Sequence, residues 1–227
     1  MKASGAAGDP APVEWRVSPG LTGYAAAVAE METRAAEIRA GTAPELVWLL
    51  EHPPLITAGT SAPADELLAP GRFPVHRSGR GGRHTYHGPG QRVGYVLLDL
   101  ARRGPDVRRF VAGLEAWLIA ALGRLDIAAR TAPGRIGIWV EDGAGHEAKI
   151  GAIGVRVRRW VTLHGFALNV DPDLGHFSAI VPCGIAAFPV TSLAALGKSI
   201  PMSALDAAIA AEFPLFLDKL GEVPVDS

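Results

Sequence analysis

A lone cysteine and a lysine are the residues of this chain whose types are best suited to chemistry. Cys183 stands between Pro182 and Gly184, and this context predicts a turn that exposes the thiol. An exposed thiolate is a nucleophile for acyl groups, and a nearby cation such as Lys149 would lower the thiol pKa from about 8.5. A small buried hydrophobe is the alternative interpretation of a single cysteine. Gly184 favours the nucleophile, because it would let an acyl group approach the backbone and receive an N–H at a developing oxyanion.

A second candidate is the polar stretch from Arg80 to Gln91, which gathers glycines, two histidines, two arginines and a tyrosine between apolar segments. Glycine loses the most backbone entropy when it is ordered, and in return it permits special dihedral angles or a close approach to a ligand. We therefore expect this stretch to form a loop around a small molecule. His84 and His87 alone would make an incomplete metal site, because no cysteine or carboxylate stands near them in the sequence, so no metal is expected.

The segments around these candidates show helical and strand patterns in turn. Apolar residues at helical spacing predict helices over 23–40, ended by Gly41, over 106–126, and over 202–220, where Pro214 should break or kink the last one. Apolar or β-branched runs predict strands over 46–50, 93–100, 136–140, 149–157 and 161–170, the last three joined as antiparallel hairpins. This order predicts a mixed α/β (α+β) fold class. Residues 1–12 are expected to form a flexible tail, and residues 13–227 a single domain.

Composition and charge exclude several classes of protein. The net charge of −1 offers no overall attraction for nucleic acid, although arginines gather around positions 102–103, 108–109 and 156–159. One cysteine cannot form an intrachain disulfide, which fits a reducing compartment. No segment approaches the ~20 apolar residues of a membrane span, and the N-terminal residues lack the apolar core of a secretory signal. We expect a cytoplasmic enzyme that binds neither nucleic acid nor membrane.

Several blocks of the sequence resemble one enzyme family. The chain is similar to the lipoyl(octanoyl) transferases, also called lipoate-protein ligase B, at every fixed position of their signature, which reads here Arg80-Gly81-Gly82-x-x-Thr85-Tyr86-His87-x-x-Gly90-Gln91-x-Val93-x-Tyr95. Residues 148–156 around Lys149, residues 160–169 and residues 182–184 around Cys183 resemble further family segments. The resemblance implies the fold of biotin and lipoate-protein ligase catalytic domains, in which helices flank a mixed β-sheet.

The resemblance also implies an activity. Enzymes of this family transfer an octanoyl group from acyl carrier protein to a lysine of a lipoyl domain, the first step of endogenous protein lipoylation. The implied acceptors are the E2 subunits of 2-oxoacid dehydrogenases and the H protein of the glycine cleavage system. Carried onto this chain, Cys183 forms the acyl-thioester intermediate, and Lys149 lowers its pKa and moves protons. No ATP or other cofactor is needed, because a thioester donor already carries an activated acyl group.

By the same resemblance, the acyl group lies against three segments of the chain. Their residues are Arg80, Gly81, Gly82, Arg83, His84, Thr85, Tyr86 and His87; Ala152, Ile153 and Gly154; and Gly165, Phe166 and Ala167. A saturated eight-carbon chain makes no hydrogen bonds, so the site must recognise it by apolar contact and length, at roughly 0.8 kcal/mol per buried methylene. We expect Arg80, Tyr86 and His87 to brace the loop and the polar end of the pocket rather than to react.

Two other functions remain open. An ATP-dependent lipoate-protein ligase of the same fold would activate a free acid as an adenylate and would need no nucleophilic cysteine, so Cys183 beside Gly184 favours transfer. A noncatalytic module would use the glycine loop to bind an acyl group or a carrier protein, and its Cys183 would be inert. The macromolecular partners that the resemblance implies are acidic, so Arg156 and Arg158 are expected to steer their docking.

Overall fold

The computed structural model describes residues 12–181 and 188–221, so nearly all of the expected N-terminal tail and Cys183 lie outside the described residues. The helical elements are α1 (Tyr24–Ala40), η1 (Ala64–Glu66), η2 (Leu100–Arg102), α2 (Val107–Gly123), η3 (Leu174–Ala179) and α3 (Met202–Gly221), where η denotes a 3-10 turn. The strands are β1 (Glu14–Leu21), β2 (Leu46–Glu51), β3 (Leu55–Ala58), β4 (Val75–Arg77), β5 (His84–His87), β6 (Gln91–Leu97), β7 (Arg130–Ala132), β8 (Arg135–Glu141), β9 (Glu147–Arg158) and β10 (Val161–Asn169).

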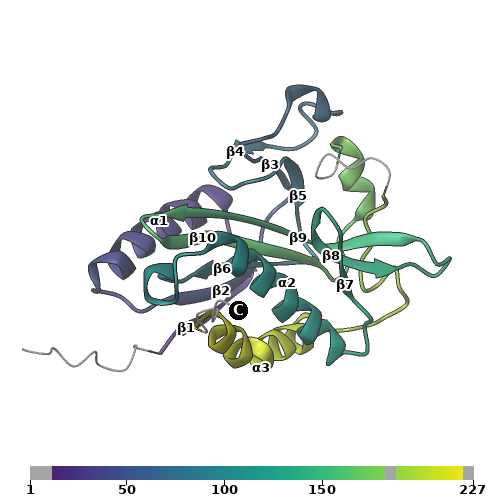
Figure 1. Cartoon of the computed structure of the whole chain (residues 1–227). Coiled ribbons are helices and arrows are strands. Elements are labelled where there is room, and N and C mark those ends of the chain that lie inside the picture. Colours follow the sequence, from purple (N-terminus) through teal and green to yellow (C-terminus); the bar gives the residue numbers. More distant parts are fainter. Residues whose placement is uncertain (1–11, 182–187, 222–227) are drawn as a thin grey trace, which may run out of the picture.

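The main sheet has seven strands in the order β1-β2-β6-β10-β9-β8-β7. β1 and β2 are parallel and the other neighbours are antiparallel, so the sheet is mixed, as predicted. Three short strands form a second sheet in the order β4-β3-β5, which projects from one side of the main sheet (Figure 1). Because β5 leads into β6 through a tight turn, in which Gln91 donates its N–H to Gly88 O, the small sheet is held against the large one.

Helices cover both faces of the main sheet. α1 lies on one face, and α2 and α3 lie side by side on the other (Figure 1). The buried stripe of α1, which includes Ala27, Met31 and Ile38, recurs at helical spacing and packs with residues of β2, β6 and β10. On the opposite face, Trp117 of α2 stacks on Phe216 of α3 with ring centroids 4.9 Å apart. Two separate apolar cores therefore hold the strands that surround the candidate site.

Capping residues mark the end of α1 and the start of α2. Gly41 ends α1 in the left-handed conformation, with its N–H on Ile38 O, as the sequence predicted. At the start of α2, the carboxylate of Asp106 accepts the backbone N–H groups of Arg108 and Arg109. Among the described residues, no helix combines the length and the apolarity needed to cross a membrane.

The predicted helices and the antiparallel hairpins of β8, β9 and β10 are confirmed, but three expectations were wrong in detail. The polar stretch 80–91 is not wholly a loop, because residues 84–87 form β5 and pair with β3. The strand predicted over 93–100 begins at Gln91 and ends at Leu97. α3 continues through Pro214, so the predicted break is wrong: this residue is exposed, so water can solvate the carbonyl that loses its donor, while the neighbouring Phe213 and Phe216 are buried in the core.

Candidate functional site

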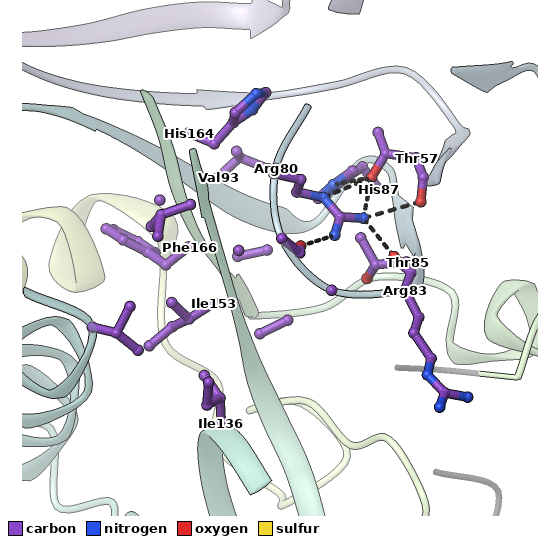
Figure 2. Close-up of a pocket in the computed structure, with 18 of the residues that line it drawn as sticks. Thr57, Arg80, Arg83, Thr85, His87, Val93, Ile136, Ile153, His164 and Phe166 are labelled. Atoms are coloured by element: carbon purple, nitrogen blue, oxygen red, sulfur yellow. Dashed lines mark hydrogen bonds between the residues drawn. The ribbon is translucent and has the colours of Figure 1, made fainter. Parts of the chain in front are cut away.

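A cavity of about 530 Å³ lies where the glycine loop meets β9, a size typical of small-molecule pockets. Pairing between β8 and β9 ends at Gly151, and beyond it the loop takes the place of β8: Gly81 donates its N–H to Val155 O over 2.9 Å. The apolar residues Ile136, Ile153 and Phe166 lie apart from the polar group of Thr57, Arg80 and His87 (Figure 2). The cavity therefore has one apolar wall and one polar wall.

This cavity brings together most of the predicted site residues, from three separate parts of the chain: residues 80–87, β9 and β10. Those that line it are Arg80, Gly81, Gly82, Arg83, Thr85, His87, Lys149, Ala152, Ile153, Gly154, Gly165, Phe166 and Ala167. Residues 152–154 and 165–167 lie side by side because β9 and β10 are paired. In their antiparallel register Ala152 pairs with Ala167, Ile153 with Phe166 and Gly154 with Gly165.

His84 and Tyr86, which were predicted to contact the acyl group, do not line the cavity. They lie on β5, where successive side chains point to opposite faces, so Thr85 and His87 face the cavity and their neighbours face away from it. Tyr86 packs between Phe73 and Phe177, its hydroxyl lies 2.8 Å from Nδ1 of His176, and burial raises its pKa to about 12. The structure therefore places Tyr86 as a brace of the small sheet.

Arg80 is held at the polar wall by fixed acceptors. Its guanidinium donates to Thr57 Oγ1 at 2.7 Å, to Thr57 O at 3.0 Å, to Gly81 O at 2.9 Å and to Arg83 O at 3.0 Å. These hydrogen bonds hold residues 81–83 of the loop and Thr57 of β3 around the side chain of Arg80. Gly154 makes room for it, because a Cβ at that position would lie 2.9 Å from Cδ of Arg80. Gly154 thus allows the loop to pack on β9, and it also lines the cavity.

Lys149 lies in the wall beside the apolar residues and is only 8% exposed. Its ammonium group donates to Ile136 O at 3.0 Å and lies 4.9 Å from the ring centroid of Trp139. Its backbone pairs with the chain that follows the Cys183 segment: Lys149 N–H donates to Pro189 O, and Lys149 O accepts the N–H of Thr191, both at 2.9 Å. A positively charged side chain is thereby fixed at the cavity, next to the described residues that follow Cys183.

Two buried histidines face the cavity as neutral groups. Burial lowers the pKa of His87 to about 3, with further lowering by nearby His52. Burial also lowers the pKa of His164 to about 4, and Arg80 adds to the shift. His164 is one of the few non-glycine residues with a left-handed backbone, at φ 61°, and its ring lies 5.8 Å from that of Tyr95. A neutral imidazole donates one hydrogen bond and accepts another but brings no charge to the substrate.

Several lining residues were missed in the sequence, among them Thr57, Tyr95, Val107, Val111, Ile136 and His164. Val107 and Val111 stand four apart on α2 and so share a helix face, but this spacing is equally typical of a core stripe. His164 directly precedes Gly165 in a family block, which was the one available signal for it. Within residues 12–181 and 188–221, no three histidine, cysteine or carboxylate side chains gather as metal ligands would.

The fold is that of lipoate-protein ligase catalytic domains. A solved structure of lipoate-protein ligase A with bound ATP superposes with a TM-score of 0.66 at 19% identity and covers 90% of this chain and 86% of the other. At that identity the likeness shows the fold. The family model for the lipoyl protein ligase A/B catalytic domain matches residues 23–214, and the chain belongs to that family.

Two curated relatives are similar along almost their whole length. An octanoyltransferase of Rhizorhabdus wittichii is 70% identical over 205 residues, which cover 90% of this chain and 92% of the relative. An octanoyltransferase of Sphingopyxis alaskensis is 69% identical over 207 residues, which cover 91% and 95%. The predicted fold, family and acyltransferase class are therefore confirmed.

Proposed function

We propose that the protein transfers an octanoyl group from acyl carrier protein to the lysine of a lipoyl domain, through a thioester on Cys183. The names and the full-length similarity of the relatives support octanoyl as the acyl group. The observation that carries the mechanism is the placement of Lys149, whose ammonium lies in the cavity wall while its backbone pairs with the residues that follow Cys183.

The cavity suits an acyl chain of this kind. The apolar wall, which includes Val111, Ile136, Ile153 and Phe166, offers the contact that a saturated chain requires, at roughly 0.8 kcal/mol for each methylene removed from water. The polar wall offers bonds for a carbonyl group and for the amides of a phosphopantetheine arm. Gly82 and Arg83, on the loop above the cavity, are candidates for the backbone donors to an oxyanion.

In the first step, the thiolate of Cys183 attacks the thioester carbon of the donor. The new C–S bond forms on Cys183, the C–S bond to phosphopantetheine breaks, and the departing thiolate takes up a proton. Lys149 supports this step as an ammonium, because a nearby positive charge favours the thiolate of Cys183 over the thiol. Exchange of one thioester for another is almost neutral in free energy, so no nucleotide is consumed.

In the second step, the amine of the acceptor lysine attacks the thioester on Cys183. An amide bond forms, the C–S bond breaks, and the proton lost by the amine passes to the cysteine sulfur; we assign this relay to Lys149, whose ammonium lies in the cavity wall. Amide formation from a thioester runs downhill, which drives the transfer. The neutral state of His87 supports a positioning role rather than proton transfer.

Mass spectrometry tests this proposal directly. The protein is incubated with octanoyl-acyl carrier protein and no nucleotide, and then with a lipoyl domain. We expect a mass increase of one octanoyl group on Cys183, absent in Cys183→Ala, and its discharge onto the lipoyl domain. Lys149→Met should lower the rate of acylation by about a hundredfold, as expected for a lost charge at the nucleophile.

The outcomes separate the alternatives. Transfer that requires ATP and octanoic acid, and that survives in Cys183→Ala, would instead identify a ligase. Binding of the acylated carrier without any covalent product would indicate a noncatalytic module. As a matched control, Lys198→Met removes an exposed lysine outside the cavity, and it should acylate at the rate of the unaltered protein.

A further inference from the structure

We propose that Gln91 and Asn169 are positioning residues for this transfer. This inference rests on the proposed function. They form the centre of a buried chain of hydrogen bonds that runs in one direction from Arg80, in the glycine loop, to the strand partner of Lys149. This chain fixes His87 as the tautomer that carries its proton on Nδ1, and it ties the polar wall of the cavity to the reacting lysine.

The first part of the chain lies between the loop and β3. Arg80 donates to Thr57 Oγ1 twice, from Nη2 at 2.7 Å and from Nε at 3.3 Å, so both lone pairs of this oxygen already accept hydrogen bonds. Thr57 Oγ1 also lies 3.4 Å from His87 Nε2, and the remaining hydroxyl proton of Thr57 can point only toward that nitrogen if both contacts are to be satisfied. His87 Nε2 is therefore an acceptor.

The second part lies at the start of β6 and the end of β10. The side-chain nitrogen Nε2 of Gln91 donates to Tyr86 O at 3.2 Å and to Asn169 Oδ1 at 3.0 Å, which leaves Gln91 Oε1 as an acceptor. That oxygen is 2.7 Å from His87 Nδ1, so the histidine must donate there. The amide orientations and the tautomer follow from the same set of partners, and each element of the chain has one consistent assignment.

The last part reaches Lys149. Asn169 donates through Nδ2 to Thr191 O at 2.9 Å, and the N–H of Thr191 donates to Lys149 O at 2.9 Å. A small cavity of about 20 Å³, lined among others by Gln91, Asn169 and Lys149, lies at this junction. The two central side chains of this hydrogen-bond chain are buried, with Gln91 2% and Asn169 4% exposed, so water does not compete for their hydrogen bonds.

The hydrogen bonds of Gln91 and Asn169 hold the segment that pairs with the backbone of Lys149. The strand segment that pairs with Lys149 includes Pro189 and Thr191, and it follows the Cys183 segment directly. Asn169 holds this segment from the side of β10, and Gln91 holds Asn169 in the orientation that makes the bond. Loss of either donor should therefore disturb the alignment of Lys149 with the acyl group while leaving the cavity able to bind the donor.

Asn169→Asp is the sharpest test, because it keeps the shape of the side chain and removes the donor to Thr191 O. We expect kcat for octanoyl transfer to fall by about tenfold, with KM for octanoyl-acyl carrier protein unchanged within about twofold. Activity should recover as the pH is lowered, because a protonated aspartic acid can donate again. Gln91→Glu, which removes the donor to Asn169, should show the same split between kcat and KM.

Thr162→Val is the matched control. Thr162 is fully buried on the same strand β10 and donates to Val96 O at 2.6 Å, but it lies outside the chain of bonds. Its loss should lower the melting temperature and leave kcat unchanged. If Asn169→Asp and Gln91→Glu fold and keep the kcat of the unaltered protein, the proposal is wrong.

A measurement on the unaltered protein covers the case in which the variants do not fold. The ¹⁵N shifts of His87 at neutral pH should show a protonated Nδ1 and an unprotonated Nε2. The opposite tautomer or an imidazolium would overturn the proposal. Failure of the proposed function is a different result, since the unaltered protein would then carry no octanoyl group on Cys183.

Discussion

Gly137 and Lys149 lie so close that a Cβ added at position 137 would be 2.8 Å from Cε and 3.1 Å from Nζ of the lysine. The backbone of Gly137 has φ 133°, and its N–H donates to Glu115 Oε1 of α2 at 2.8 Å. The ammonium of Lys149 therefore reaches Ile136 O by passing over a residue that has no side chain. The position of Lys149 therefore depends on a glycine on the neighbouring strand.

Gly137→Ala should displace Lys149 and lower the rate of Cys183 acylation by at least about tenfold, measured by mass spectrometry at a series of times. The same change should destabilise the fold, because the new Cβ would also lie 2.7 Å from Gly151 O. Gly145→Ala is the matched control: it has φ 80° on the same hairpin and nothing within 4 Å. It should cost about 1 kcal/mol of stability and leave acylation intact, and an equal loss of rate in both variants would contradict the interpretation.

Acidification should destabilise the protein through its buried histidines. The pKa of His87 is lowered to about 3 and that of His164 to about 4, below the ordinary value of 6.5. Between the lowered and the ordinary value, the unfolded chain binds protons that the folded chain does not bind. Their contribution to the free energy of unfolding is therefore complete above pH 6.5 and is lost as the pH falls, at roughly 1 kcal/mol per pH unit for each group.

Denaturant titrations at about pH 7, 6 and 5 measure this slope. His164→Gln should make the dependence on pH shallower, because it removes one of the two histidines whose pKa burial lowers. The difference between this variant and the unaltered protein isolates His164 from the carboxylates that titrate in the same range. Equal slopes in His164→Gln and in the unaltered protein would show that His164 is not held neutral.

Ala152→Leu should shift the preferred acyl chain toward shorter lengths. Ala152 lines the cavity beside its strand partner Ala167, so a larger side chain at position 152 occupies space that the acyl group would use. Two methylenes excluded from the pocket correspond to roughly a tenfold change in relative kcat/KM, so hexanoyl should gain on octanoyl by about that factor. Ala116→Leu, at an exposed position of α2, is the control and should keep the original ratio. An unchanged ratio in Ala152→Leu would place the acyl chain elsewhere.

Charge reversal at Arg158 should slow transfer from an acidic carrier protein. Arg158 ends β9, three residues beyond Val155 of the cavity wall, and is exposed, whereas Arg156 is paired with Glu32 at 3.2 Å and is the less suitable position for this test. In Arg158→Glu we expect kcat/KM to fall by about threefold at low ionic strength and to approach the original value at high salt. Lys219→Glu makes the same change of charge on α3. Equal effects of the two variants would argue against steering at Arg158.

Much of the fold was predictable because its signals are local. The helix that Gly41 ends, the helix that follows Asp106 and the hairpins of β8 to β10 depend on spacing and turns within a few residues. β5 was missed because its four residues stand among glycines, and only pairing with β3 makes them a strand. Pro214 was expected to break or kink α3, but the helix does not break there, and the neighbouring Phe213 and Phe216 pack against Trp117.

By itself, the sequence determined the family to which its motifs belong, and it predicted Cys183 as the acyl-carrying nucleophile and Lys149 as its cationic partner. The tertiary structure alone decided that His84 and Tyr86 turn away from the cavity, that Gly137 accommodates Lys149, and that Gln91 and Asn169 connect the loop to the lysine. Motifs reside in neighbouring residues, whereas these contacts join strands far apart in the chain. Their register is set by the pairing of the whole sheet, which no local pattern encodes.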